Sequence, residues 1–456
     1  MVSAAPNAVE AASQDEPKLT LTRRLGVYSC AAIIMGITIG SGIFRVPSEV
    51  AQAVPSVGGM AILWIAAGLI TLCLALSLSE LATMFPRAGG NFVFINEAWG
   101  PLAAFLYGWT FLLINPAGWA AISTMFAEYL GHFVPLTDLG RRGVAISLIA
   151  LVTFANYRSV PLAAGVQNVA TTAKALALFG LAVVIFSQAP GTDGALADPI
   201  TFEIPSVASF VIALLGVLWA YEGVASFCAL AGEVKDPART LPRALMLGAV
   251  GVIVLYLLVN AAYTYVMPIE EIATSKLVAA SAMGKVAGAF AAGIVAGLVM
   301  LCTFGSVAAV SLSDPRVFYA MAQERLFFRN IGRVHPSFNT PHVAVLTAGG
   351  MACIWVMARD FQELYSAFIM GQWPFYTLAV LGIFRLRKTR PHAERPYRVF
   401  GYPFVPLVFA MAAIALVVTY LVQQPRLSVI NVAVVLTGVP VYFIWRRLQR
   451  VGDTAG

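Results

Sequence analysis

The sequence predicts an all-α membrane protein with twelve transmembrane helices and one continuous membrane domain. Of its 456 residues 59% are hydrophobic and only 11% are charged, against roughly 25% charged in an ordinary soluble domain. Long apolar stretches recur along the chain, bounded by charged residues, proline or glycine. A spanning helix needs about 20 apolar residues, so the chain is long enough for twelve of them. This composition excludes a water-soluble or a disordered protein.

The distribution of positive charge orients the expected spans. Of the 29 lysines and arginines, 21 lie in segments on the side of the N-terminus and 6 in the opposite segments. Positive residues collect in cytoplasmic segments, so we expect both termini to be cytoplasmic in a multi-pass protein of the inner (cytoplasmic) cell membrane. The first 24 residues lack the pattern of a signal peptide. The expected spans are 25–53, 58–85, 98–130, 143–157, 162–187, 207–231, 243–266, 283–312, 341–358, 361–384, 403–423 and 428–445.

The cysteines and histidines of the chain show no pattern typical of an enzyme or a metal site. The five cysteines lie in apolar stretches, which predicts small core residues and no disulfide framework. The four histidines are scattered without the spacing of metal ligands. The net charge of +7 follows from the cytoplasmic segments, so it does not indicate nucleic acid. We therefore expect no enzyme activity, no cofactor and no metal ion.

Two spans contain residues that interrupt a continuous helix near mid-membrane. Irregular backbone is tolerated there only where it lines a cavity or is buried in protein. Interruptions in corresponding positions, five spans apart, predict a five-plus-five inverted repeat with the binding site at its interface. The first span reads Gly36-Ile37-Thr38-Ile39-Gly40-Ser41-Gly42-Ile43-Phe44, and the sixth reads Trp219-Ala220-Tyr221-Glu222-Gly223-Val224.

The repeat divides the chain into five segments. They are a cytoplasmic tail (1–24), a first repeat with helices one to five (25–187), a second with helices six to ten (207–384), helices eleven and twelve (403–445) and a cytoplasmic tail (446–456). Two alternatives stay open. The glycines of the first span also suit close helix packing, and Glu222 also suits a buried structural acid.

The two breaks together are expected to form a receptor for a zwitterion. An unwound helix leaves carbonyl groups at the end of its first half and amides with partial positive charge at the start of its second half. The amides of residues 41–43 would hold a carboxylate, assisted by the Ser41 hydroxyl. The carbonyl groups of Thr38, Trp219 and Glu222 would accept hydrogen bonds from an α-ammonium group.

Glycine at positions 40 and 42 fits this receptor, because a Cβ there would keep a ligand off the backbone. The predicted substrate-binding residues are Thr38, Ile39, Gly40, Ser41, Gly42, Ile43, Trp219, Ala220, Tyr221, Glu222 and Gly223.

Lys174 and Glu222 are candidates for coupling, and Trp219 and Arg45 for gating. Lys174 lies near the middle of the fifth span, too deep to reach the membrane surface. It would replace a sodium ion, tether the first broken helix or release a proton, with a purely structural lysine as the alternative. Trp219 would close the outward path over the ligand, or be an ordinary aromatic. Arg45 would pair with Glu222 as an outer gate, or with Glu49 four residues on.

Short motifs follow one another in a characteristic order over residues 20 to 445. They include Gly40-Ser41-Gly42-Ile43-Phe44, Phe85-Pro86-Arg87-Ala88-Gly89-Gly90, Asn115-Pro116-Ala117, Val166-Gln167-Asn168, Gly232-Glu233-Val234-Lys235-Asp236-Pro237 and Arg395-Pro396-Tyr397-Arg398-Val399. Together they resemble the amino acid-polyamine-organocation (APC) transporters, in particular the L-type amino acid transporter branch and its bacterial relatives. The resemblance implies the LeuT-like fold of two inverted five-helix repeats plus two helices, working by alternating access.

The resemblance also assigns roles to single residues. It implies that the breaks hold the backbone of an amino acid, and that Lys174 is the lysine found in the sodium-site region of sodium-independent relatives. The chain departs from the animal L-type members at Glu222, where they usually carry glycine, and at Arg45. Residues 131–142 contain no cysteine, so we expect no disulfide-linked heavy subunit.

The sequence therefore predicts a sodium-independent secondary transporter for L-amino acids, embedded in the lipid bilayer. It would run as an exchanger or a proton-linked carrier, and neutral amino acids are expected first, because Glu222 is the only unpaired acid found near the breaks. One alternative is a carrier of cationic amino acids or polyamines that uses Glu222. Another is a receptor that binds an amino acid without moving it.

Overall fold

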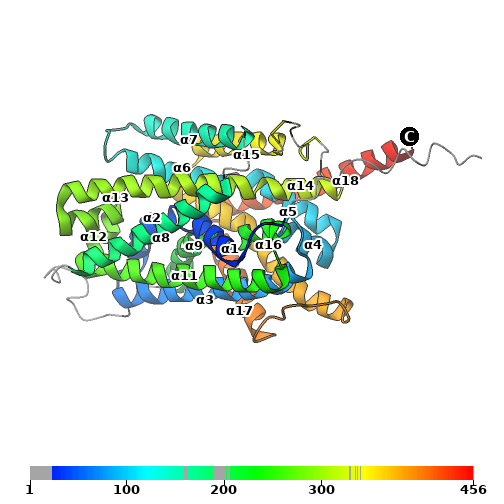
Figure 1. Ribbon diagram of the computed structural model, residues 1–456, viewed down its shortest axis with the longest axis horizontal. Coiled ribbons are helices and arrows are strands. Elements are labelled where there is room, and N and C mark those ends of the chain that lie inside the picture. Colours follow the sequence, from blue (N-terminus) through cyan, green and yellow to red (C-terminus); the bar gives the residue numbers. More distant parts are fainter. Residues whose placement is uncertain are drawn as a thin grey trace, which may run out of the picture.

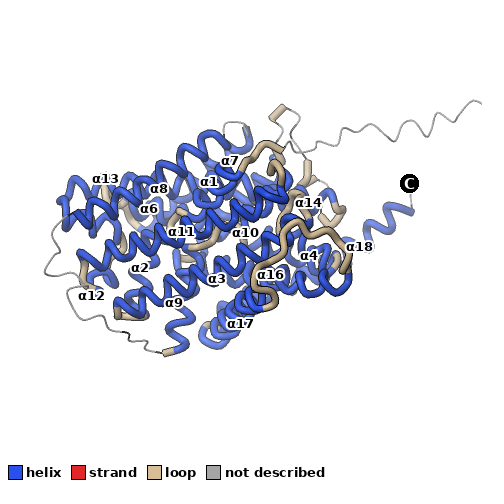
Figure 2. Tube along the Cα trace, turned by 60° about the horizontal axis from the view of Figure 1, so that its bottom comes forward, coloured by secondary structure: helices blue, strands red, loops and turns tan. Residues whose placement is uncertain are grey.

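The computed structural model describes residues 23–158, 163–187, 202, 206–327, 330–333, 335, 337–338 and 340–454. Within these residues the chain is almost entirely helical, and its one β contact is an isolated bridge between Leu25 and Val234. Figure 2 shows helices joined by loops. The helices are α1 (Val27–Thr38), α2 (Gly42–Ala53), α3 (Val57–Met84), α4 (Asn91–Trp99), α5 (Pro101–Ile114), α6 (Pro116–Leu130), α7 (Asp138–Arg158), α8 (Ala163–Ser187), α9 (Val207–Ala220), α10 (Val224–Phe227), η2 (Cys228–Glu233), α11 (Pro237–Val266), α12 (Ile269–Thr274), α13 (Val278–Ser313), α14 (Pro315–Gln323), α15 (His342–Ala358), α16 (Phe361–Thr389), α17 (Phe404–Gln423) and α18 (Pro425–Thr454).

The described helices include a set long and apolar enough to cross a membrane. Eight stretches have this character, and α1 with α2 forms a ninth across a bend of 46°. The helices α7, α8 and α15 occupy the positions of predicted spans four, five and nine. Helices therefore stand at all twelve predicted positions, and the predicted all-α, multi-pass membrane fold is confirmed. The eight stretches are Val57–Met84, Pro101–Leu130, Val207–Glu233, Pro237–Val266, Val278–Gln323, Phe361–Thr389, Phe404–Gln423 and Pro425–Arg447.

The broken helices lie in the middle of the bundle. In Figure 1 α1, α9 and α16 lie at the centre, with α3 and α11 along one side and α13 along the other. The helix α1 packs against α11, α8 and α13, while α2 packs against α9. The helices α7 and α15 lie side by side at one edge. Protein surrounds the unwound backbone, as a break in a membrane helix requires.

Some element boundaries differ from the prediction for local reasons. The region predicted as span three is divided at Gly100, where φ is 89°, and at the Asn115-Pro116 step. The helix α13 begins at Val278 rather than near 283, because a kink at Gly288 joins a short helix to the span. At the C-terminus α18 continues to Thr454, so the predicted tail 446–456 is largely helical. The predicted tail 1–24 lies outside the described residues except for its last two.

Both predicted breaks are present. The helix α1 ends at Thr38 and α2 begins at Gly42, so three residues between them belong to neither helix. The helix α9 ends at Ala220, and α10 begins at Val224 after a three-residue turn. Glycine-rich sequence disfavours a continuous helix at the first break, since each glycine costs about 1 kcal/mol relative to alanine.

The two breaks cross at close range through their glycines. A Cβ at Gly42 would overlap the backbone of Ala220, and a Cβ at Gly223 would overlap the Thr38 hydroxyl. We expected glycine at position 42 because a Cβ would block a ligand, and this explanation is wrong. Ala220 already fills that space, so close helix packing accounts for the glycine.

A backbone clasp joins the start of the first span to the segment after the sixth. The amides of Arg24 and Leu25 both donate to the carbonyl oxygen of Glu233, at 2.8 and 3.0 Å. In return, the amide of Lys235 donates to the carbonyl oxygen of Leu25 at 2.9 Å. These bonds hold the N-terminal end of α1 against the end of η2.

Candidate functional site

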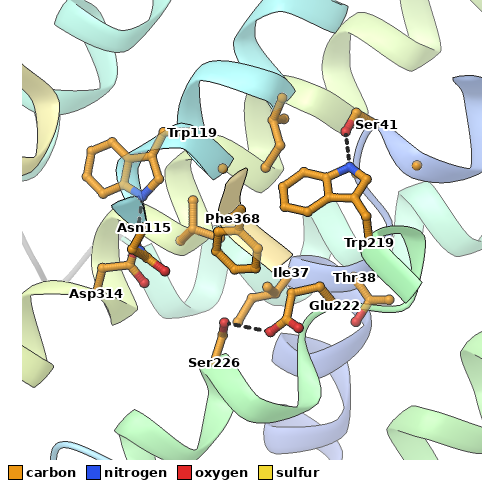
Figure 3. A pocket seen from close by; sticks show the side chains of 15 residues that line it. Ile37, Thr38, Ser41, Asn115, Trp119, Trp219, Glu222, Ser226, Asp314 and Phe368 are labelled. Carbon is orange, nitrogen blue, oxygen red and sulfur yellow. Dashed lines mark hydrogen bonds between the residues drawn. The ribbon is translucent and has the colours of Figure 1, made fainter. Parts of the chain in front are cut away.

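A small cavity lies between the two breaks and the helices α6, α13 and α16 (Figure 3). Its volume is about 30 Å³, which is room for roughly two water molecules. A free amino acid does not fit in this conformation, so binding one requires lining side chains to move. The lining residues are Ile37, Thr38, Gly40, Ser41, Gly42, Asn115, Gly118, Trp119, Ile122, Trp219, Glu222, Ser226, Val310, Asp314 and Phe368.

The predicted binding residues divide into two groups around this cavity. Six of them line it: Thr38, Gly40, Ser41, Gly42, Trp219 and Glu222. The other five lie within or beside the breaks but do not line the cavity: Ile39, Ile43, Ala220, Tyr221 and Gly223. The two predicted residues farther along the chain, Arg45 and Lys174, also lie outside the lining.

The start of α2 has hydrogen-bond donors in and beside the cavity lining. Gly42 and Ile43 are the first residues of the helix, so their amides have no carbonyl partner within it. Ser41 stands just before them, and its hydroxyl accepts a hydrogen bond from Trp219 Nε1 at 3.3 Å. Unpaired amides at a helix start favour a negatively charged ligand, so this geometry is compatible with the carboxylate site predicted from the sequence.

The carbonyl group of Thr38 is not available as predicted. It accepts hydrogen bonds from the Tyr256 hydroxyl and from the amide of Gly40, both at 2.8 Å. A carbonyl oxygen has two lone pairs, so in this conformation both are used. Thr38 therefore holds α1 to α11 rather than awaiting an ammonium group. The Trp219 carbonyl also accepts one hydrogen bond, from the amide of Glu222 at 3.1 Å.

Trp219 is buried against the aromatic side chains of α16. Its ring stacks on Tyr365 with centroids 6.3 Å apart and meets Phe368 edge to face at 5.1 Å. Figure 3 shows the indole between Ser41 and Phe368, at the margin of the cavity. A hydrogen bond of 2.5 Å from the Tyr365 hydroxyl to Glu49 Oε2 continues this contact to α2.

Arg45 pairs with Glu49 of this contact rather than with Glu222. Its Nε lies 3.9 Å from Glu49 Oε1, one helical turn further along α2. The alternative of an i, i+4 pair is therefore present, and no ion pair joins Arg45 to Glu222 among the described residues. Beside the first break, a chain of contacts thus runs from Trp219 through Tyr365 and Glu49 to Arg45.

Glu222 points into the cavity from the second break (Figure 3). Its Oε1 accepts hydrogen bonds from the hydroxyls of Ser226 at 3.2 Å and Tyr376 at 3.3 Å. Both donors are neutral, and none of the ion pairs between described residues includes Glu222. A cation or a proton is therefore needed to offset its charge.

Asp314 is a second acid of the cavity, and the sequence analysis missed it. Its carboxylate accepts hydrogen bonds from Asn115 Nδ2 at 2.6 Å and Trp119 Nε1 at 2.7 Å, and only 5% of the residue is exposed. It stands with helical backbone between α13 and α14, just before Pro315, although the residue before a proline usually lies outside a helix. The signal that was available is the Asn115-Pro116 step in the third span, a polar interruption at membrane depth.

Lys174 ties three helices together beside the first break. Its Nζ donates to Ser306 Oγ at 2.8 Å and to the carbonyl oxygens of Gly36 and Ile39 at 3.3 and 3.4 Å. The Ser306 hydroxyl also lies within 3.1 Å of the same two carbonyl oxygens. Two carbonyl groups and a hydroxyl are ligands that suit a small hard cation, and here an ammonium group occupies them.

Comparisons with known proteins agree with this architecture. A family model described as amino acid permease matches residues 25–441. The b(0,+)-type amino acid transporter 1 of Rattus norvegicus is 32% identical, over 94% of this chain and 89% of that protein. The cystine/glutamate transporter of Homo sapiens is 29% identical over 95% and 88%. The serine/threonine exchanger SteT of Bacillus subtilis (strain 168) is 27% identical over 93% and 97%.

Proposed function

Because this chain belongs to the amino acid permease family, a family of transporters rather than enzymes, we propose that it carries L-amino acids across the membrane by alternating access. The observation that supports this most directly is the cavity between the two broken helices, with the free amides of α2 on one side and a carboxylate on the other. An α-amino acid offers the complementary pair of charges on a single carbon atom.

Capture of the amino acid backbone starts at the first break. The substrate carboxylate binds the amides of residues 41–43 and the Ser41 hydroxyl, where the helix dipole favours negative charge. The α-ammonium group turns toward the second break, to the carbonyl groups of Trp219 and Glu222. Trp219 moves aside to admit the substrate and returns over it, and its link to Arg45 through Tyr365 and Glu49 serves as the outer gate.

Transport without sodium follows from the position of Lys174. Its ammonium group occupies two carbonyl oxygens of the first break and the Ser306 hydroxyl, so a sodium ion has no place there. The protein runs as an exchanger or as a proton-linked carrier, in which Lys174 and Glu222 are the coupling groups. A fixed structural lysine is the competing explanation.

The wider architecture follows the same proposal. Residues 25–187 and 207–384 form the two inverted repeats, and both termini lie in the cytoplasm, with the protein in the inner cell membrane. No disulfide-linked heavy subunit is involved, since residues 131–142 contain no cysteine.

One observation favours a second substrate class. Neutral amino acids were expected because Glu222 stood alone as an acid, but Asp314 lines the same cavity. Two carboxylates without a lining cation suit an amino acid or polyamine that carries an additional positive charge. One relative is named for cystine and glutamate and another for serine and threonine, so both neutral and cationic amino acids stay open as substrates of this chain.

Counterflow into proteoliposomes tests the function. Purified protein is reconstituted, loaded with one unlabelled amino acid and given a labelled panel of neutral, cationic and acidic amino acids, with and without sodium and a pH gradient. We expect exchange that is independent of sodium. Binding without counterflow would indicate a receptor, and the absence of competition by any amino acid would overturn the proposal.

A further inference from the structure

The cavity is lined by two carboxylates and by no basic side chain. Glu222 receives hydrogen bonds from two hydroxyls, and Asp314 receives them from an amide, an indole and a hydroxyl. Neutral donors stabilise a carboxylate without cancelling its charge. Burying an uncompensated charge is costly, so a site with this lining favours an incoming cation.

Asp314 is the better buried of the two acids. Asn115 and Trp119 both donate to Oδ2, and the hydroxyl of Ser313 donates to Oδ1 at 3.3 Å. A carboxylate has about four lone-pair positions, so Oδ1 keeps one for another donor. The nearest basic residue along the chain, Arg316, is not its partner, because its guanidinium pairs with Glu233 at 2.9 Å.

The position of Asp314 matches the far end of a bound side chain. In Figure 3 Asp314, Asn115 and Trp119 lie on one side of the cavity, and Ser41 and Trp219 lie on the other. A substrate whose backbone is held at Ser41 therefore extends its side chain toward Asp314. The lining between the two ends is apolar, from Ile37, Ile122, Val310 and Phe368.

We propose that Asp314 determines the substrate specificity of this carrier by accepting the terminal ammonium or guanidinium group of the substrate side chain. The inference rests on the proposed function, because it takes the backbone to be held at the helix breaks. Amide and indole donors hold the carboxylate in one orientation, and the apolar middle of the cavity packs against the methylene stem of the substrate. The preferred substrates are then amino acids with a cationic group at the end of a flexible side chain.

A matched pair of ligands tests this on the unmodified protein. Lysine and norleucine share the same backbone and a side chain of similar length, but norleucine lacks the terminal ammonium group. We expect lysine to compete for a labelled substrate at least tenfold better than norleucine. Equal competition by the two would overturn the role of Asp314. If no amino acid of any class competes, the proposed function fails as well, so the two failures are distinguishable.

The variant Asp314→Asn tests whether Asp314 causes the preference for lysine over norleucine. Asparagine keeps the shape and one accepting oxygen but removes the charge, so the preference for lysine over norleucine should fall at least tenfold while norleucine still competes. Asp138→Asn is the matched control, because Asp138 is an exposed acid outside the cavity lining, and it should leave the preference unchanged.

Two further variants keep the inference decidable if Asp314→Asn does not fold. Asp314→Glu keeps the charge but extends it by one methylene into the cavity, so the preference should shift from lysine toward ornithine. Glu222→Gln should leave the ratio of lysine to norleucine largely intact. Suppose instead that Glu222→Gln abolishes the preference for lysine over norleucine and that Asp314→Glu leaves this preference unchanged. Glu222 then binds the cationic group, and the assignment to Asp314 is overturned.

Discussion

Lys174 Nζ lies 2.8 Å from Ser306 Oγ, and both groups reach the carbonyl oxygens of Gly36 and Ile39 where α1 unwinds. This contact joins α8 and α13 to the first break. An ammonium group in this position holds the broken helix through charge-assisted hydrogen bonds, which are about twice as strong as neutral ones. We expect the loss of these hydrogen bonds to loosen the first half of the span.

Lys174→Ala should lower the exchange rate at least tenfold while folded protein is still recovered. The carbonyl groups of α1 then keep only the Ser306 hydroxyl as a partner, and any proton carried by the lysine is lost. Counterflow at several pH values measures both effects, with Lys388→Ala as a control at an exposed lysine. An unchanged rate with an unchanged pH profile would assign Lys174 a purely structural role.

Trp219→Phe should raise the half-saturation concentration of transport about 2- to 10-fold. Phenylalanine keeps an aromatic ring over the cavity but loses the hydrogen bond to Ser41, which is worth about 0.5–1.5 kcal/mol. The control is Trp109→Phe, which loses indole hydrogen bonds to Val434 and Thr437 away from the cavity. If both variants shift the half-saturation concentration equally, the Trp219 contact has no gating role.

Gly42→Ala should destabilise the protein by about 1–3 kcal/mol, because its methyl group would overlap the backbone of Ala220. A thermal unfolding curve in detergent should show a lower midpoint. Gly297→Ala is the matched control, since a Cβ there meets no atom within 4 Å in the middle of α13. It should be neutral or slightly stabilising, and equal midpoints for the two variants would contradict the close crossing.

Glu80→Gln should destabilise the protein by about 3 kcal/mol, at the lower end of the range for a buried ion pair. Glu80 is fully buried, and its carboxylate accepts from Arg387 Nε at 3.0 Å, from Arg387 Nη2 at 2.6 Å and from the amide of Val399 at 2.8 Å. Arg387 keeps 24% of its side chain exposed, which limits the loss.

The control for Glu80 is Glu324→Gln, which removes an exposed ion pair with Arg87. Surface pairs contribute about 0–1 kcal/mol, so the unfolding midpoint should hardly change. A midpoint for Glu80→Gln as high as that of the control would show that the buried pair contributes little to stability.

Local sequence was sufficient for the helices and for the two predicted breaks. Apolar length predicts a span wherever it occurs, and the glycines around Ser41 and the Glu222-Gly223 pair disfavour helix within a few residues of themselves. Lys174 lies in α8, the helix at the position of the predicted fifth span, and only 3% of the residue is exposed. These features depend on neighbours in the chain, so one sequence contains them.

The partners of the site residues depend on contacts between distant parts of the chain. The carbonyl group of Thr38 is occupied by Tyr256, which lies 218 residues away. Asp314 resembles a loop acid before a proline until the packing of α5 and α6 brings Asn115 against it, 199 residues away. No periodicity or spacing encodes such pairs, so the sequence alone led to a cavity with one acid instead of two.

The backbone clasp between Leu25 and the residues around Val234 limits how the first and sixth spans can move during transport. Three backbone hydrogen bonds link the residues before α1 to the residues at the end of η2, so we expect movement of one segment to be coupled to the other. Opening the site at this end of the bundle therefore either breaks these hydrogen bonds or moves both segments together. A cross-link between the start of α1 and the end of η2 would then show whether the two segments move together or separate during transport.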